Sequence, residues 1–256
     1  MAHVIAIAGK GGVGKTTLSG LLIQAMCKLG KTPILAVDAD ANSNLNEVLG
    51  VDVEMTLGEV REQIERAATS SQNPIPSGMS KADYAEIMFQ RCLNEDDDFD
   101  LLVMGRTQGK GCYCYVNGIL QAQMQKLLPH YQYMIVDNEA GMEHISRGIL
   151  PKVDTLILVS DCSRRGVQAA GRIAQLAKEC NLNPSTMGLI VNRAPGGKLN
   201  AGTLEEIEQE GLKLLGVVPH DDLVYEYDCD GKPTVQLPDD SAVRTALNEI
   251  IKKISL

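Results

Sequence analysis

The sequence contains no tryptophan, two phenylalanines and seven tyrosines among its 256 residues, so few side chains could stack on nucleic-acid bases. Acidic residues outnumber basic ones by 33 to 24, and the formal net charge of −9 gives no electrostatic basis for nonspecific DNA binding. No apolar stretch approaches the roughly 18 residues that a transmembrane helix needs, and the N-terminus has no signal-peptide pattern. We therefore expect a cytoplasmic protein that binds neither nucleic acid nor membrane.

The length of the chain indicates how many domains it forms, and its cysteines indicate which chemistry they support. A chain of 256 residues is long enough for one α/β domain with a well-buried core. The chain has seven cysteines, and in the reducing cytoplasm that we expect for it disulfides are rare. We therefore expect their spacing to reflect metal or redox chemistry rather than cross-links.

Short apolar segments alternate with longer helical patterns along most of the chain. This alternation is typical of right-handed βαβ units and predicts an α/β fold, with a mainly parallel sheet covered by helices on both faces. Ligands of such sheets bind at the carboxyl ends of the strands. The expected strands are His3–Ala8, Pro33–Val37, Leu101–Met104, Met134–Asp137, Thr155–Ser160, Gly188–Asn192 and Leu214–Val218. The expected helices are Thr16–Leu29, Val116–Leu127, Arg165–Cys180, Leu204–Glu210 and Ala242–Lys253.

Residues 51–98 interrupt the alternation. They are polar, include a turn-rich stretch over residues 70–78 and end in an acidic run at residues 95–98. Because blocks of like charge usually stay solvated, we interpret this run as surface rather than as a metal site. The sequence predicts a single domain over residues 1–256, with a helical and loop insertion at about 51–98.

The segment Gly9–Thr16 matches the phosphate-binding pattern G-x-x-x-x-G-K-[ST]. It follows an expected strand and precedes an expected helix, as a P-loop NTPase fold requires. Its glycines allow backbone N–H groups to converge on phosphate oxygens at a helix N-terminus. Lys15 is expected to reach the β- and γ-phosphates and Thr16 to hold Mg²⁺. The expected nucleotide-binding residues of the loop are Gly9, Gly11, Gly12, Val13, Gly14, Lys15, Thr16 and Thr17.

Acidic residues follow two further strands. Asp38 and Asp40 come directly after one of them, where a carboxylate can orient an attacking water molecule. Asp137 ends an apolar run in the Walker B pattern, so we expect it to hold Mg²⁺ through water. Gly141 lies four residues later and would let the backbone of a switch segment approach phosphate.

Lys10 is a second lysine at the start of the loop, and the resulting pattern KGGVGKT resembles the deviant phosphate-loop ATPases. That class includes the nitrogenase iron protein, the Min and Par positioning ATPases and the metallocentre-assembly ATPases. The resemblance implies a homodimer in which Lys10 reaches the partner's nucleotide and stabilises its phosphate charge. It also implies that Asp40 positions the water and that Asp38 supports it near Mg²⁺. The expected catalytic residues are thus Lys10, Lys15 and Asp40.

Base recognition is expected at the ends of two later strands. Asn192 and Arg193 resemble the adenine-reading position of this class, and Pro219, His220 and Asp221 resemble its second base-contacting loop. The guanine signature N-K-x-D is absent. We therefore expect ATP and ADP, rather than guanine nucleotides, as ligands.

Cys112 and Cys114 form a C-x-C pair between an expected strand and an expected helix. One chain then supplies half of a four-sulfur site, and a two-fold dimer with facing pairs would complete it. Such a site suits tetrahedral Zn²⁺ or square-planar Ni²⁺, and the spacing does not choose between them. The alternative is a pair of small apolar side chains in a turn.

Together with the cysteine pair, the segment Gly141–His144 makes the chain resemble the CooC family, whose ATPases insert nickel into carbon monoxide dehydrogenase. The resemblance implies delivery of Ni²⁺ (or Zn²⁺) to a nickel-dependent client enzyme, either that dehydrogenase or acetyl-CoA synthase. Two alternatives stay open. One is an iron–sulfur scaffold ATPase, and the other is a positioning ATPase like those of the Min and Par systems. A nitrogenase-type reductase is disfavoured because the switch segment lacks the second cysteine that it needs.

Overall fold

A computed structural model describes residues 2–40, 42–69, 75–106, 114–139 and 152–254, with the backbone path alone for 65–69 and 114–120. Eight strands form one sheet in the order β3-β4-β2-β5-β1-β6-β7-β8. All neighbours are parallel except β3 and β4, which pair antiparallel at one edge. The strands are β1 His3–Gly9, β2 Ile34–Ala39, β3 Leu93–Glu95, β4 Phe99–Val103, β5 Tyr133–Asn138, β6 Thr155–Ser160, β7 Thr186–Ala194 and β8 Leu214–Pro219.

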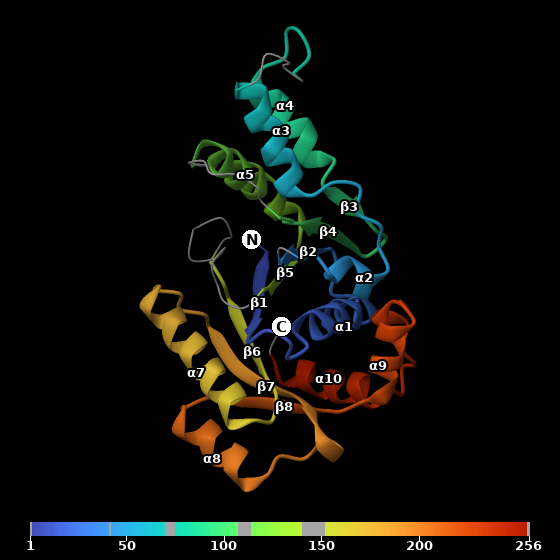
Figure 1. The fold of residues 1–256 in the computed structure, drawn as a ribbon, viewed down its shortest axis with the longest axis vertical. Helices are drawn as coiled ribbons and strands as arrows, with labels where there is room; N and C mark the ends of the chain where they lie inside the picture. The colour runs from blue at the N-terminus through green and yellow to red at the C-terminus, as the bar shows by residue number, and fades with distance from the viewer. Residues whose placement is uncertain (1, 41, 70–74, 107–113, 140–151, 255–256) are drawn as a thin grey trace.

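Helices cover both faces of this sheet (Figure 1). They are α1 Lys15–Lys28, α2 Leu45–Leu49, α3 Leu57–Thr69, α4 Lys81–Gln90, α5 Cys114–Leu127, α7 Arg164–Glu179, α8 Ala201–Gln209, α9 Asp222–Cys229 and α10 Ala242–Lys253. The predicted α/β class, with a mainly parallel sheet covered by helices on both faces, is therefore confirmed.

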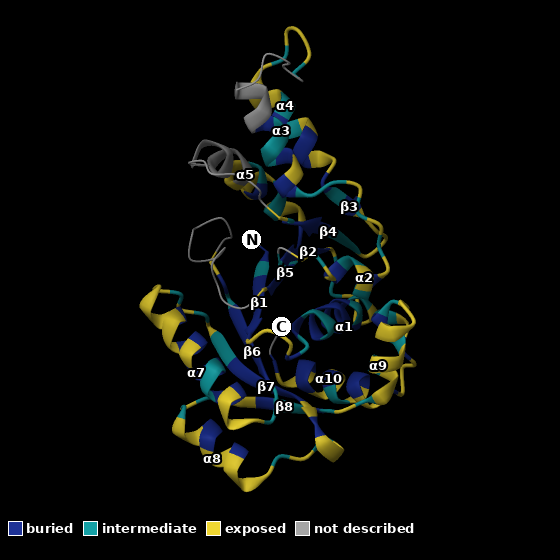
Figure 2. Cartoon of the chain, in the orientation of Figure 1, coloured by how far each residue is buried: buried dark blue, intermediate teal, exposed yellow. Residues whose placement is uncertain are grey.

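The two faces of the sheet carry separate apolar layers, because side chains alternate along each strand. On β1, Val4 and Ala6 face a layer built with α3, α4, α5, α7 and α8. Ile5 and Ile7 face the opposite layer, built with α1, α2 and α10. The central strands are buried on both sides, which explains their continuous apolar runs (Figure 2).

Residues 51–98 contain α3, α4 and β3 in the structure. Leu57 and Val60 of α3, with Met88 and Phe89 of α4, join the same apolar layer as the central strands. The side-chain oxygen of Asn94 on β3 accepts from the N–H of Glu54, and its amide donates to the carbonyl of Leu101 at 3.1 Å. These contacts tie both ends of the segment to the sheet.

Two helices near the phosphate-binding loop were not expected from the sequence. The short helix α2 ends at Gly50, which has the left-handed φ of 75° that favours glycine. Helix α9 begins at an N-cap, Asp221, whose carboxylate accepts from the N–H of Leu223 at 3.1 Å. Helix α5 begins at Cys114, two residues before the expected start at Val116.

Candidate nucleotide site

The loop between β1 and α1 has the backbone that the phosphate-binding pattern predicts. Gly12 and Gly14 adopt positive φ angles of 79° and 90°, and Gly14 is the N-cap of α1. A Cβ on Gly9 would lie 2.2 Å from the carbonyl oxygen of Val159 on β6, so the loop can leave the sheet there only as glycine. Gly11 lies in open space, and Val13 is buried.

Lys15 is buried at the first turn of α1, and its ammonium group donates to the carbonyl of Lys10 at 3.3 Å. Burial lowers the pKa of Lys15, and the nearby carboxylates of Asp137, Asp40 and Glu139 partly offset this effect. A partly desolvated ammonium held over the loop suits a phosphate ligand. The side chain of Lys10 is exposed, and Thr16 is half-buried beside Lys15.

Asp38 and Asp137 are register partners on neighbouring strands β2 and β5, and both are buried. The Asp137 Oδ1 accepts a hydrogen bond of 3.0 Å from the Ser19 hydroxyl, while Oδ2 is buried without a hydrogen-bond partner. Burial raises the pKa of Asp137 to about 7, and Asp38 adds to this, against the Thr16 and Ser19 hydroxyls and the Lys15 ammonium. A buried, unpartnered carboxylate oxygen is a position that fits a hydrated divalent cation.

Asp38 shapes the loop that carries Asp40. Its Oδ1 accepts from the N–H of Asp40 and its Oδ2 from the N–H of Leu45, each at 2.9 Å. Burial raises the pKa of Asp38, and these two N–H groups counteract the shift. The half-buried Asp40 in turn accepts from the N–H of Asn42 at 2.8 Å. The two aspartates thus lie in one hydrogen-bonded loop next to the phosphate-binding loop.

In sequence the cysteine pair follows β4, and the end of that strand lies beside this loop. Arg106 donates from Nη2 to Asn42 Oδ1 at 2.8 Å. Cys112 lies outside the described residues, as does Gly141. Cys114 is the first residue of α5, so its expected place in a loop is wrong, because the helix starts earlier than its apolar pattern indicates. Among the residues that the structure describes, no three His, Cys, Asp or Glu side chains form a metal-binding group.

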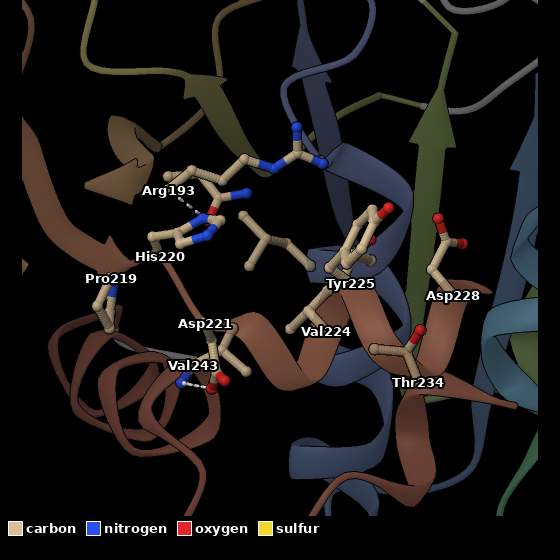
Figure 3. A pocket seen from close by; sticks show the side chains of 13 residues that line it. Arg193, Pro219, His220, Asp221, Val224, Tyr225, Asp228, Thr234 and Val243 are labelled. Carbon is tan, nitrogen blue, oxygen red and sulfur yellow. Dashed lines mark hydrogen bonds between the residues drawn. The ribbon is translucent and has the colours of Figure 1, made fainter. Parts of the chain in front are cut away.

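The expected base-contacting residues surround one cavity of about 220 Å³ next to the phosphate-binding loop (Figure 3). Asn192 is buried at the end of β7, where its amide donates to the carbonyl of Val13 at 2.9 Å and its Oδ1 accepts from the N–H of Arg193. Arg193 donates to the carbonyl of Gly12 at 3.1 Å. Both side chains therefore tie β7 to the loop. The expected residues that line the cavity are Gly14, Thr17, Asn192, Arg193, Pro219, His220 and Asp221.

Several residues of the site were not expected from the sequence. Ser19 bridges the Lys15 carbonyl and Asp137, and its position one turn after Lys15 on α1 was the available signal. Helix α9 supplies a whole wall of the cavity, and its eight residues have too weak an apolar pattern to be recognised. The unexpected lining residues are Leu18, Val224, Tyr225, Asp228, Thr234 and Val243.

Residues 4–235 match the family model for the CobQ/CobB/MinD/ParA nucleotide binding domain. The chain belongs to this family of ATP-binding P-loop NTPases.

Several known proteins are similar to this chain along most of its length. An uncharacterised ATP-binding protein of Methanocaldococcus jannaschii is 40% identical over 256 residues, 98% of either chain. The carbon monoxide dehydrogenase accessory protein CooC of Rhodospirillum rubrum is 30% identical over 237 residues, which cover 88% of this chain and 86% of that protein. Among solved structures, the septum site-determining protein MinD of Pyrococcus horikoshii with Mg-ADP superposes with a TM-score of 0.71 at 21% identity, covering 100% of this chain and 96% of that one.

No helix in the part of the chain that the structure describes combines the length and the apolar character that crossing a membrane takes.

Proposed function

We propose that the chain is a homodimeric ATPase that carries nickel on Cys112 and Cys114 and delivers it to a nickel-dependent enzyme such as carbon monoxide dehydrogenase or acetyl-CoA synthase. The observation that carries the ATPase part is the pair of buried carboxylates, Asp38 and Asp137, beside the Lys15 ammonium. This arrangement gives a triphosphate both a cation and a place for a hydrated metal ion.

The described residues divide this work between them. Lys15 binds the β- and γ-phosphates, and Thr16 with Asp137 would hold Mg²⁺, which supplies charge neutralisation when it is bound. The carboxylate of Asp40 orients the attacking water, because Asp38 fixes the loop that carries it. The exposed ammonium of Lys10 is available to a second copy of the chain.

The nickel part rests on the placement of the cysteine pair and on one relative. The cysteines follow Arg106 in sequence, and Arg106 donates a hydrogen bond to Asn42 of the Asp40 loop, so we expect a change at the γ-phosphate to reach the metal-binding segment through this contact. The name of the relative from R. rubrum connects that protein with carbon monoxide dehydrogenase. Two thiolates per chain suit a four-sulfur Ni²⁺ or Zn²⁺ site across a two-fold axis.

A mixing experiment tests the dimer and the role of Lys10. We expect Lys10→Ala and Asp40→Asn each to abolish ATP hydrolysis while retaining ADP binding. In an equal mixture, half of the dimers are mixed, and one of their two sites has both an intact Asp40 and the partner's Lys10. Hydrolysis should therefore recover to about a quarter of the wild-type rate. A mixture as inactive as its components would show that Lys10 acts within its own chain.

Equilibrium nickel titration tests the metal. We expect Ni²⁺ to bind wild-type protein at one ion per dimer and the Cys112→Ser/Cys114→Ser variant far more weakly. Nickel affinity should also differ between protein with ADP and protein with a non-hydrolysable ATP analogue, and nickel should change nucleotide affinity by the same factor. Equal nickel binding by wild type and variant would remove the metallochaperone function and leave the ATPase.

A positioning ATPase is the second candidate, because the matching family includes MinD and ParA. Co-sedimentation with liposomes and with DNA, each with and without ATP, separates the two functions. ATP-dependent capture by either surface, together with unchanged nickel binding in the cysteine variant, would favour positioning.

A further inference from the structure

We infer that Tyr225 on α9 is the residue on which the nucleobase stacks. The inference deepens the proposed nucleotide site and rests on it, since it assigns a base-contacting residue that neither the loop motif nor the ends of β7 and β8 supply. Tyr225 lines the cavity that also contains Gly14 and Thr17 of the phosphate-binding region.

The exposure of Tyr225 is unusual for this chain. Tyr225 is 69% exposed, whereas the other tyrosines whose side chains the structure describes, at positions 84, 131, 133 and 227, are buried or half-buried. Tyr227 lies two residues away on the same helix, yet it packs on the apolar layer of α1 and α10 and donates to the carbonyl of Gln236 at 3.4 Å. A large aromatic side chain left at the mouth of a cavity gains burial when a flat ligand covers it.

Helix α9 holds Tyr225 in a fixed place beside the cavity. The carboxylate of Asp221 caps the helix through the N–H of Leu223 and also accepts from the N–H of Val243, the second residue of α10, at 3.2 Å. Val224 packs into the layer beneath the helix. One turn of α9 is thus attached to α10, and an aromatic wall on an anchored helix loses little conformational freedom on binding.

The opposite wall has the chemistry that a base needs. Figure 3 shows Arg193 and His220 on one side of the cavity and Tyr225 on the other. Arg193 has a positive φ of 55°, and its Nη1 donates a hydrogen bond to the carbonyl of Gly12. A planar guanidinium and an aromatic ring can both stack on the face of a base. We therefore expect the base to enter the cavity edge first, so that its faces can stack on Tyr225 and on Arg193. The phosphates of the nucleotide then lie toward Gly14 and Thr17.

The absence of tryptophan makes this contact directly measurable, since tyrosine fluorescence is unobscured. We expect ADP with Mg²⁺ to quench part of the wild-type tyrosine emission. Tyr225→Phe should bind ADP with unchanged affinity by calorimetry, because stacking needs the ring and not the hydroxyl. The same variant should lose the quenching, because the tyrosine whose emission ADP quenches is gone. Tyr225→Ala should bind ADP about tenfold more weakly, in line with the loss of one base–aromatic stack. Leu223→Ala, also exposed on α9 but outside the cavity, should match wild type.

The outcomes separate this inference from the proposed function. If wild-type protein does not bind ADP, the nucleotide site itself fails. If wild type binds ADP and Tyr225→Ala binds it equally well, the stacking role alone is overturned. Inorganic pyrophosphate, which has no base, should bind wild type and Tyr225→Ala with equal affinity. A selective loss of pyrophosphate affinity in Tyr225→Ala would show that the residue supports the loop instead.

Discussion

Arg106 donates from its guanidinium to the side-chain oxygen of Asn42 at 2.8 Å, and this bond joins two parts of the site that are 64 residues apart in sequence. Asn42 belongs to the loop that Asp38 and Asp40 shape. Arg106 is the last described residue before the cysteine pair. Met104, two residues before Arg106, is also attached to α3, since the N–H of Gly58 donates to its carbonyl at 2.8 Å.

Removing the bond between Arg106 and Asn42 should uncouple nickel from nucleotide. We expect Arg106→Ala to bind ADP alone and Ni²⁺ alone with the affinities of wild type. The effect of nucleotide on nickel affinity should be lost. The reason is that the bond attaches the Asp40 loop to the residue from which the cysteine segment continues. Nickel titrations with and without ADP measure it, with Arg172→Ala on α7, an exposed arginine away from the site, as control. Retained coupling in Arg106→Ala would assign the relay to another segment.

The elements that carry motifs were predictable because each consists of local signals. The strand ending at Asp137 is an apolar run closed by an acid, and the loop Gly9–Thr16 is a contiguous pattern. Their meeting at one edge follows from the parallel sheet alone. Gly14 and Thr17 of the cavity lining follow from the loop pattern, whereas Asn192, Arg193, Pro219, His220 and Asp221 were expected from the resemblance to the deviant phosphate-loop ATPases.

The missed features depend on contacts between distant residues. The Asn192 amide bonds to Val13, 179 residues away, and nothing near Asn192 in sequence indicates it. Strand β3 has three residues, too few for alternation to be visible, and Asn94 secures it through side-chain bonds to the backbone. Helix α9 carries Asp222, Glu226 and Asp228 among its eight residues. With only two apolar side chains turned inward, its sequence looks like that of a polar loop.

Asn192 should stabilise the loop rather than read the base. Its amide N–H already donates to the carbonyl of Val13, and its Oδ1 already accepts from the N–H of Arg193. Because neither group is then directed at the base, Asn192→Ala should weaken the binding of ADP and of inosine diphosphate by the same factor. The loss of two hydrogen bonds should also lower the free energy of unfolding of the nucleotide-free protein by about 1–3 kcal/mol. Calorimetry with both nucleotides and urea unfolding measure these effects. A larger loss for ADP than for inosine diphosphate would instead support direct recognition of the adenine amino group.

Asp137 should make stability fall as pH rises. Its pKa is about 7 in the folded protein, against an unperturbed value of 3.8, so the folded state binds the proton more tightly than the unfolded state does. The free energy of unfolding should therefore decrease as pH rises from about 4 to about 7 and lose no more above that range. Asp137→Asn should remove this contribution. Urea midpoints at pH 5 and pH 8, measured with a chelator to remove Mg²⁺, compare the two proteins. A parallel pH dependence in both would show that Asp137 is ionised throughout.

Gly9 should tolerate no side chain, although it is only one of several glycines in the loop. An alanine Cβ at this position would lie 2.2 Å from the backbone oxygen of Val159, and a backbone atom in the middle of the sheet cannot move aside as a flexible side chain does. Separating β1 from β6 would disturb the pairing of Gly9 with Val159 and the start of the phosphate-binding loop. We expect Gly9→Ala to lower the free energy of unfolding by roughly 2–4 kcal/mol, a large loss for a single methyl group. Gly11→Ala is the matched control, because a Cβ there meets no atom within 4 Å. Thermal unfolding of both nucleotide-free variants measures the difference, and equal stability of the two would mean that β6 shifts to accommodate the methyl group.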